Sequence, residues 1–168
     1  NGQKVLIRVD YNVPLDDNFN VTDATRIIRT KETIAKILGD GGIANLMSHL
    51  GRPKGEVNDK YSLRHIVSKV SEELGQEVVF AGDVLSEEAA TTIAGLQPGS
   101  IAMLENLRFH AEEEKGDVDF AKAIARLGDV YVNDAFGTAH REHASTATIA
   151  RCFPGNAFAG YLLYNEVQ

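Results

Sequence analysis

Arginine and histidine side chains collect where short apolar runs of this sequence end. Four of these runs end in a string that contains an arginine, and three of the four strings also contain histidine. Guanidinium groups bind carboxylates and phosphates through paired hydrogen bonds and keep their charge at physiological pH. The pattern therefore predicts a binding site for a small anion with several negative charges. The arginines are Arg8, Arg52, Arg108 and Arg141, and the histidines are His49, His110, His140 and His143.

The overall charge of the chain makes this local positive charge more informative. The sequence has 17 Lys and Arg against 24 Asp and Glu, which gives a formal net charge of −7. An acidic surface repels nucleic acids and acidic membranes, so we expect neither as a partner. Alternatives stay open for single residues, because an arginine beyond a strand can be a solvated surface charge. Arg8 can also form a structural ion pair with Asp10 or another carboxylate.

Three other polar patterns favour structural roles. The string His140-Arg141-Glu142-His143 holds two possible metal ligands three residues apart, but no third ligand has a suitable spacing, so we expect no metal site. His110 is expected to cap a helix or to pair within an acidic loop. The three glutamates at 112–114 are expected to form a solvated face or a helix start.

The chain has no nucleotide-binding signature. The glycine-rich stretch at 39–42 follows a predicted helix and precedes a predicted strand, whereas a phosphate-binding loop needs the opposite order. We interpret this stretch as a helix stop. Neither G-x-G-x-x-G nor G-x-x-x-x-G-K-[ST] occurs, so no cofactor is expected to bind this chain.

Alternating strands and helices position the basic strings. The apolar runs begin roughly 25–40 residues apart, the spacing of a strand and a crossover helix. They are continuously apolar, which is typical of parallel strands buried on both faces. We predict an α/β fold with a doubly wound, mostly parallel six-stranded sheet and helices on both faces, a Rossmann-like three-layer α/β/α arrangement. The predicted strands are 4–9, 43–48, 78–80, 101–104, 130–133 and 157–161, and the predicted helices are 24–38, 63–74, 87–96 and 118–127.

Capping residues mark several of the predicted helix ends. Asp23 and Ser86 are placed to cap the first and third helices, and Gly75 and Gly128 to end the second and fourth in a left-handed conformation. We find no linker or repeat and expect one domain over residues 1–168.

A cytoplasmic protein is expected. The only cysteine, Cys152, cannot form an internal disulfide. No signal peptide or stretch of about 20 apolar residues is apparent. The chain does not begin with methionine, which we interpret as a sign that it was cut from a longer protein.

Six strings in their order along the chain resemble the phosphoglycerate kinase family. They are RVDYNVP, DATRI, MSHLGRP, ENLRFH, DAFGTAHREHAS and AGYLLYNE, which together extend from Arg8 to Glu166. The resemblance implies reversible phosphoryl transfer between 1,3-bisphosphoglycerate with ADP and 3-phosphoglycerate with ATP, a glycolytic reaction. It implies that this chain is the N-terminal, glycerate-binding half. The C-terminal half, which binds Mg²⁺ with ATP or ADP, would be absent, and the chain alone would be inactive.

The resemblance also implies roles for individual residues. Asp10 and Asn12 would contact the hydroxyl and carboxyl end of the substrate, and Arg26 would lie beside the transferred group as the catalytic residue. His49, Arg52, Arg108 and Arg141 would complete the basic basin, with Arg8 and His140 at its periphery. The family further implies a monomer whose partners are its substrates and its own C-terminal domain.

Two positions depart from the usual pattern of the family. Tyr11 stands where phenylalanine is usual, and we expect it to be tolerated if its hydroxyl finds a partner. Glu142 stands where a small residue is common, and we expect it to face solvent.

Two other functions remain open. One is a stand-alone, one-domain homologue that binds phosphorylated acids without catalysis. The other is a generic doubly wound domain, such as a receiver or flavin-binding domain, in which the arginines are surface charges.

Overall fold

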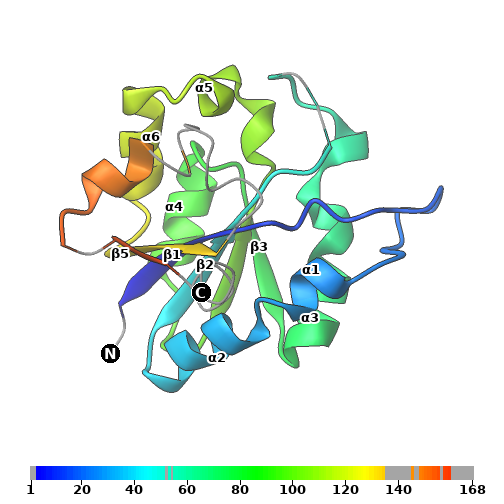
Figure 1. Ribbon diagram of the computed structural model, residues 1–168, viewed down its shortest axis with the longest axis horizontal. Helices are drawn as coiled ribbons and strands as arrows, with labels where there is room; N and C mark the ends of the chain where they lie inside the picture. Colours follow the sequence, from blue (N-terminus) through cyan, green and yellow to red (C-terminus); the bar gives the residue numbers. More distant parts are fainter. Residues whose placement is uncertain are drawn as a thin grey trace.

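Six parallel strands form one sheet in the computed structural model, which describes residues 3–51, 53, 55–134, 145, 148–155 and 157–159 (Figure 1). The strand order is β3-β4-β2-β1-β5-β6, and every neighbouring pair is parallel. The predicted fold class is therefore confirmed. The strands are β1 Lys4–Val9, β2 Ile43–Met47, β3 Val78–Gly82, β4 Ile101–Leu104, β5 Val130–Asp134 and β6 Ala157–Ala159.

Helices cover both faces of this sheet. Helices α1, α2 and α3 lie on one side, whereas α4, α5 and α6 lie on the other (Figure 1). The α-helices are α1 Thr25–Ile28, α2 Lys31–Gly39, α3 Val67–Leu74, α4 Glu87–Ala94, α5 Ala111–Glu114 and α6 Val118–Ala125. Short 3₁₀ helices are η1 Asp59–Tyr61, η2 Leu63–Ile66, η3 Leu107–Phe109 and η5 Thr148–Cys152.

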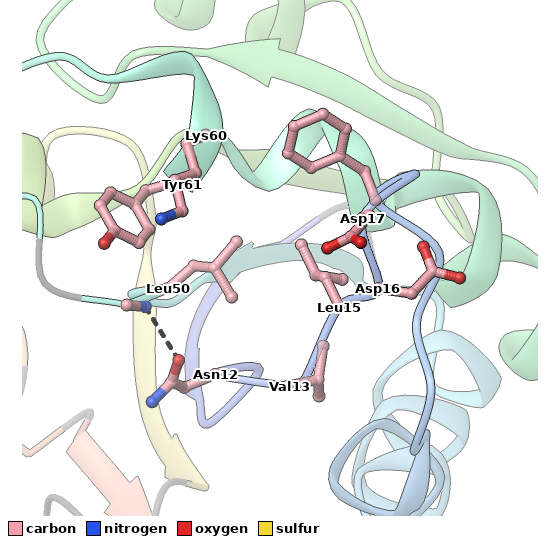
Figure 2. A pocket seen from close by; sticks show the side chains of 10 residues that line it. Asn12, Val13, Leu15, Asp16, Asp17, Leu50, Lys60 and Tyr61 are labelled. Atoms are coloured by element: carbon pink, nitrogen blue, oxygen red, sulfur yellow. Dashed lines mark hydrogen bonds between the residues drawn. The ribbon is translucent and has the colours of Figure 1, made fainter.

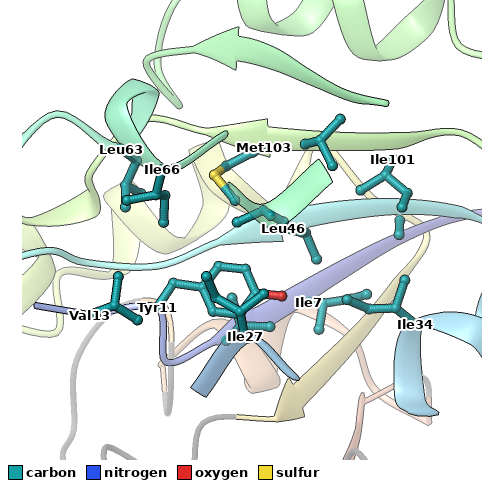
Figure 3. Packing of buried hydrophobic residues seen from close by; sticks show 14 of the residues in the cluster. Ile7, Tyr11, Val13, Ile27, Ile34, Leu46, Leu63, Ile66, Ile101 and Met103 are labelled. Carbon is teal, nitrogen blue, oxygen red and sulfur yellow. The ribbon is translucent and has the colours of Figure 1, made fainter. Parts of the chain in front are cut away.

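The strand side chains divide between two hydrophobic clusters because successive residues of a strand point to opposite faces. In β1, Ile7 packs in the cluster that contains Ile27 of α1 and Ile34 of α2 (Figure 3). Leu6, its neighbour in the sequence, packs in the other cluster with Ile124 of α6. The sheet is therefore the middle layer of three, and β1 is buried on both of its faces.

The first predicted helix, 24–38, is two helices in the structure. The chain turns at Arg29 and Thr30, between α1 and α2. The Thr30 hydroxyl donates a hydrogen bond to the Ile27 carbonyl oxygen (2.7 Å). Such a side-chain hydrogen bond competes with the backbone hydrogen bonds of a helix, which makes threonine a poor residue inside one. The N-cap residue of α1 is Ala24, although the Asp23 carboxylate still accepts hydrogen bonds from the amide and hydroxyl of Thr25.

Of the other three predicted caps, two are confirmed and one is wrong. Ser86 accepts a hydrogen bond from the Ala89 amide at the start of α4, and Gly75 ends α3 with φ of 75°. Gly128 does not end α6 in a left-handed conformation, because α6 stops at Ala125. A Cβ atom on Gly128 would lie 2.7 Å from Leu6 Cγ, so this glycine allows close packing on the sheet.

Tyr11 has the hydroxyl partner that its burial requires. Its side chain is fully buried, and its Oη lies 2.6 Å from Thr30 Oγ1. Because Thr30 donates to Ile27, the Tyr11 hydroxyl is the donor of this pair. Burial raises the pKa of Tyr11, so the group stays neutral. The pair joins the loop after β1 to the turn between α1 and α2.

Loss of the acceptor should destabilise the protein more than loss of the donor. Thr30→Val leaves a buried tyrosine hydroxyl without a partner and should lower the free energy of unfolding by about 1–3 kcal/mol, whereas Tyr11→Phe should cost about 1 kcal/mol. Urea unfolding measures both variants and the double variant, whose cost should be less than the sum. Thr91→Val, at an exposed position of α4, is the control. A Thr30→Val variant as stable as this control would contradict the role of the pair.

Asp83 and His110 connect the loop after β3 to the start of α5. His110 Nε2 lies 2.7 Å from Asp83 Oδ1. Burial opposes the ionisation of Asp83, but the hydrogen bonds from His110 and the Leu85 amide outweigh it and hold the Asp83 pKa below its ordinary value. The hydrogen bond to Asp83 holds the pKa of His110 above its ordinary value despite burial. His110 therefore pairs with an acidic residue of another loop and not within its own acidic segment, and its side chain makes no capping hydrogen bond to α5, so both expectations for this residue were wrong.

The two pKa directions define a pH window for this ion pair. The raised pKa of His110 means that its contribution to stability is lost as the pH rises through the His110 pKa. The lowered pKa of Asp83 means that its contribution is lost as the pH falls through the Asp83 pKa. The stability difference between wild type and Asp83→Asn should therefore be greatest between about pH 4 and about pH 6.5. Thermal unfolding from pH 3 to pH 9 tests this, with Asp17→Asn at an exposed loop as control. A difference that does not change with pH would refute the pairing.

Candidate functional site

The carboxyl ends of the parallel strands meet at one edge of the sheet. Strands β1 and β5 are neighbours in the middle of the sheet, and the chain continues from β1 to β2 on one side and from β5 to β6 on the other, so the connections leave this pair in opposite directions. Ligands of open α/β sheets bind at such a point, outside the carboxyl ends of the strands. The residues that follow β1, β2 and β4 are therefore the ones to examine.

Asp10, Asn12 and Arg26 form a hydrogen-bonded group at this edge. Arg26, in helix α1, donates through Nη1 to Asp10 Oδ1 (3.2 Å) and to the Asn12 carbonyl oxygen (2.7 Å). The Arg26 side chain is 49% exposed, whereas that of Asp10 is 20% exposed. The guanidinium is thus held at one nitrogen while half of the side chain remains accessible to a solute.

The Asn12 side chain connects the loop after β1 to the loop after β2. Its Oδ1 accepts a hydrogen bond from the Gly51 amide at 2.9 Å (Figure 2). Gly51 has φ of 63°, and a Cβ atom there would lie 2.4 Å from the Tyr61 ring. Only glycine fits this position without a shift of the ring.

His49 and Arg8 are buried side chains of the loop after β2 and of strand β1. The His49 side chain is almost fully buried, and Arg8, within β1, is fully buried. Arg8 Nη2 lies 2.9 Å from His49 Nδ1, and Arg8 Nε donates to Ser145 Oγ at 2.9 Å. Burial lowers the pKa of Arg8, and the negative charge of Glu113 is the largest opposing influence. Arg8 is therefore a structural arginine whose main anionic neighbour is Glu113, with Asp10 contributing less.

Arg108 is also buried, at 6% exposure, in the short helix η3 after β4. Its amide donates to Asn106 Oδ1 (3.0 Å), and Asn106 Nδ2 donates to the carbonyl oxygens of Leu50 (2.7 Å) and Tyr61 (2.9 Å). The loop after β4 is thus attached to the loop after β2. Burial of a guanidinium is costly, so Arg108 is not a solvated surface charge.

The predicted site is only partly covered by the structure. The structure joins Asp10, Asn12 and Arg26 directly, and it attaches His49 and Arg108 to the same edge through the loop at 48–51. Arg52, His140 and Arg141 lie outside the described residues. The convergence of all the basic side chains on one concave face therefore remains a prediction.

A pocket of about 360 Å³ lies next to this group. Among the predicted site residues that the structure describes, Asn12 alone lines this pocket, so the pocket adjoins the hydrogen-bonded group without enclosing Arg26, His49 or Arg108 (Figure 2). The lining residues are Asn12, Val13, Leu15, Asp16, Asp17, Phe19, Leu50, Gly51, Lys60 and Tyr61.

Glu113 corrects an expectation from the sequence. The run at 112–114 does start a helix, α5, but Glu113 is fully buried and does not face solvent. Its Oε1 accepts from the Ser145 amide at 2.9 Å, and its Oε2 accepts a short hydrogen bond from Ser145 Oγ. Three consecutive glutamates give no signal that one of them points inward, because its partners, Ser145 and Arg8, are distant in sequence.

Neither a metal centre nor a membrane span is found in the part of the chain that the structure describes. No group of three or more His, Cys, Asp or Glu side chains there could hold a metal ion. None of the described helices has the length and apolar character needed to cross a bilayer.

The fold matches solved phosphoglycerate kinases. The crystal structure of phosphoglycerate kinase from Pyrococcus horikoshii OT3 superposes with a TM-score of 0.87 at 31% identity, covering 99% of this chain and 42% of that one. The structure of phosphoglycerate kinase from Coxiella burnetii gives a TM-score of 0.86 at 35% identity, covering 99% and 41%.

The sequence comparisons agree with the structural ones. "Phosphoglycerate kinase 3, cytosolic" of Arabidopsis thaliana is 55% identical over 167 residues, and phosphoglycerate kinase of Chlorobaculum tepidum is 52% identical over 167 residues. The chain spans about two fifths of the length of these curated relatives, 41% and 42%. The family model described as phosphoglycerate kinase matches residues 1–168. The chain therefore belongs to the phosphoglycerate kinase family.

Proposed function

We propose that this chain, as one domain over residues 1–168, is the glycerate-binding half of a phosphoglycerate kinase. Its ligands are 3-phosphoglycerate and 1,3-bisphosphoglycerate. The proposal rests mainly on the geometry of Arg26. Its side chain is hydrogen-bonded to Asp10 and Asn12, and half of it is exposed at the carboxyl edge of the sheet. The proposed ligand-binding residues are Asp10, Asn12, Arg26, His49, Arg52, Arg108 and Arg141, with His140 at the periphery. Arg8, expected at the periphery, is fully buried and supports the site without contacting the ligand.

The chemistry of the reaction fits this set of residues. The glycerate carboxylate is itself the nucleophile, so the protein does not need to supply a base. The reaction needs alignment and positive charge around oxygens that otherwise repel one another. Arg26 is the residue that we place beside the transferred phosphoryl group, where an arginine can contribute several powers of ten in rate.

The nucleotide belongs to the other half of the enzyme in this proposal. Mg²⁺ with ATP or ADP would be held by a C-terminal domain, which is the partner of this chain together with its substrates. The share of the relatives that the chain covers supports this division. The Arabidopsis relative that is named cytosolic supports the expected cytoplasmic localisation, and the monomeric state remains an expectation.

3-Phosphoglycerate should bind the isolated chain in a salt-sensitive manner, because open ion pairs are screened by salt. Arg26→Ala should raise the dissociation constant roughly tenfold to a hundredfold, the cost of losing charge-assisted hydrogen bonds. NMR titration at low and high salt measures this. Arg29→Ala, at the exposed arginine just after α1, is the matched control and should change little. No shifts in wild type at millimolar ligand would overturn the proposed function.

Phosphoryl transfer should be undetectable with this chain alone. Free ATP cannot replace a nucleotide held in line with the carboxylate, since orientation is worth effective concentrations of about 10⁵ M or more. The assay combines the chain, ATP and 3-phosphoglycerate, and follows the product through NADH oxidation. Activity that is present in wild type and absent in Arg26→Ala would contradict this expectation, because it would show a nucleotide site within the chain.

A further inference from the structure

A buried chain of polar groups connects helix α5 to the loop after β2. It starts at Glu113, passes through Ser145 and Arg8, and ends at His49. All four residues are buried, with exposed fractions of 0% for the first three and 4% for His49. Each consecutive pair is joined by a hydrogen bond, from Ser145 Oγ to Glu113, from Arg8 Nε to Ser145 Oγ (2.9 Å), and between Arg8 Nη2 and His49 Nδ1 (2.9 Å).

The direction of the last hydrogen bond follows from the chemistry of arginine. A guanidinium has five donor hydrogens and no acceptor. His49 Nδ1 must therefore accept the hydrogen bond from Arg8 Nη2, and it cannot carry a proton itself. The proton of the imidazole is then on Nε2, and the ring is neutral.

The other hydrogen bonds fix Arg8 in this role. Ser145 Oγ accepts from Arg8 Nε, so its own hydrogen is directed to Glu113 Oε2. Both oxygens of Glu113 accept hydrogen bonds from Ser145, as an ionised carboxylate does. Tyr131 adds a hydrogen bond from its hydroxyl to the Ser145 carbonyl oxygen (2.7 Å). Glu113 thus supplies the charge that compensates Arg8, and Ser145 sets the plane of the guanidinium.

We propose that Glu113, Ser145 and Arg8 are positioning residues that hold His49 as the neutral tautomer with its proton on Nε2. His49 would then serve the anion site as an oriented hydrogen-bond donor and not as a cation, and the positive charge offered to the ligand would come from the arginines. The ligand-binding part of this inference rests on the proposed function. The tautomer itself does not.

The wild-type chain allows a direct test without any substitution. Long-range ¹H–¹⁵N correlation spectra near pH 7 distinguish an imidazole nitrogen that carries hydrogen from one that accepts a hydrogen bond. We expect His49 Nδ1 to be an acceptor and Nε2 to carry the proton. A proton on Nδ1, or on both nitrogens, would overturn the proposal.

Two variants test whether Glu113 and Ser145 act through Arg8. Glu113→Gln removes the compensating charge, and Ser145→Ala keeps that charge but removes the bridging hydroxyl. In both, the His49 nitrogen signals should move toward those of a mixture of tautomers, and the dissociation constant of 3-phosphoglycerate should rise about fivefold to tenfold. Glu112→Gln, at the neighbouring exposed glutamate of α5, is the matched control and should change neither quantity.

The readouts separate this inference from the proposed function. A folded Ser145→Ala variant with unchanged His49 signals would overturn the positioning role, even if 3-phosphoglycerate binds wild type. The expected tautomer together with no binding of 3-phosphoglycerate would support the positioning role and overturn the proposed function. If Glu113→Gln does not fold, Ser145→Ala and the wild-type spectra still decide the question.

Discussion

The burial of one guanidinium in the middle of the sheet constrains much of this structure. Arg8 lies in β1, fully inaccessible to solvent, and an unpaired ion in such a place costs several kcal/mol. The cost is offset only if partners arrive from separate parts of the chain, here Ser145, His49 and the charge of Glu113. The need to compensate the buried Arg8 guanidinium therefore fixes the position of each of these partners. Strand β1 thus sets the positions of the loop after β2 and of helix α5.

The loops at the carboxyl edge are held together by side chains that bond to backbone groups. Ser48 accepts a hydrogen bond from the Tyr11 amide, Asn12 accepts one from Gly51, and Asn106 donates to Leu50. Backbone groups in loops lack the partners that strands provide, so such side chains satisfy them. The result is a rigid edge on which a half-exposed side chain such as Arg26 can be held in one orientation. Anion binding by a few arginines requires such fixed orientations.

Local patterns in the sequence predicted the strands, the layers and the position of the basic strings, because strands buried on both faces are apolar throughout. The same patterns were less reliable for residues whose role depends on contacts with residues distant in the sequence. Gly128 looked like a helix end but is needed for close packing against Leu6, and the buried Glu113 resembled a solvated acid. The turn at Thr30 was missed because a threonine inside an apolar helical pattern is ambiguous until its hydroxyl partner is known. Arg52 and Arg141 were assigned from their place after predicted strands and by resemblance, and both remain predictions.

Burial separates two kinds of arginine that the sequence presents alike. Arg8 has no surface left for a ligand, so its charge acts only on its protein neighbours. Arg26 makes two hydrogen bonds through one nitrogen and keeps about half of its side chain exposed, so its charge can act on a solute. A ligand that replaces water around Arg26 gains a charge-assisted contact without breaking the buried chain of polar groups. The rigidity of the site and its affinity for anions can therefore depend on different arginines.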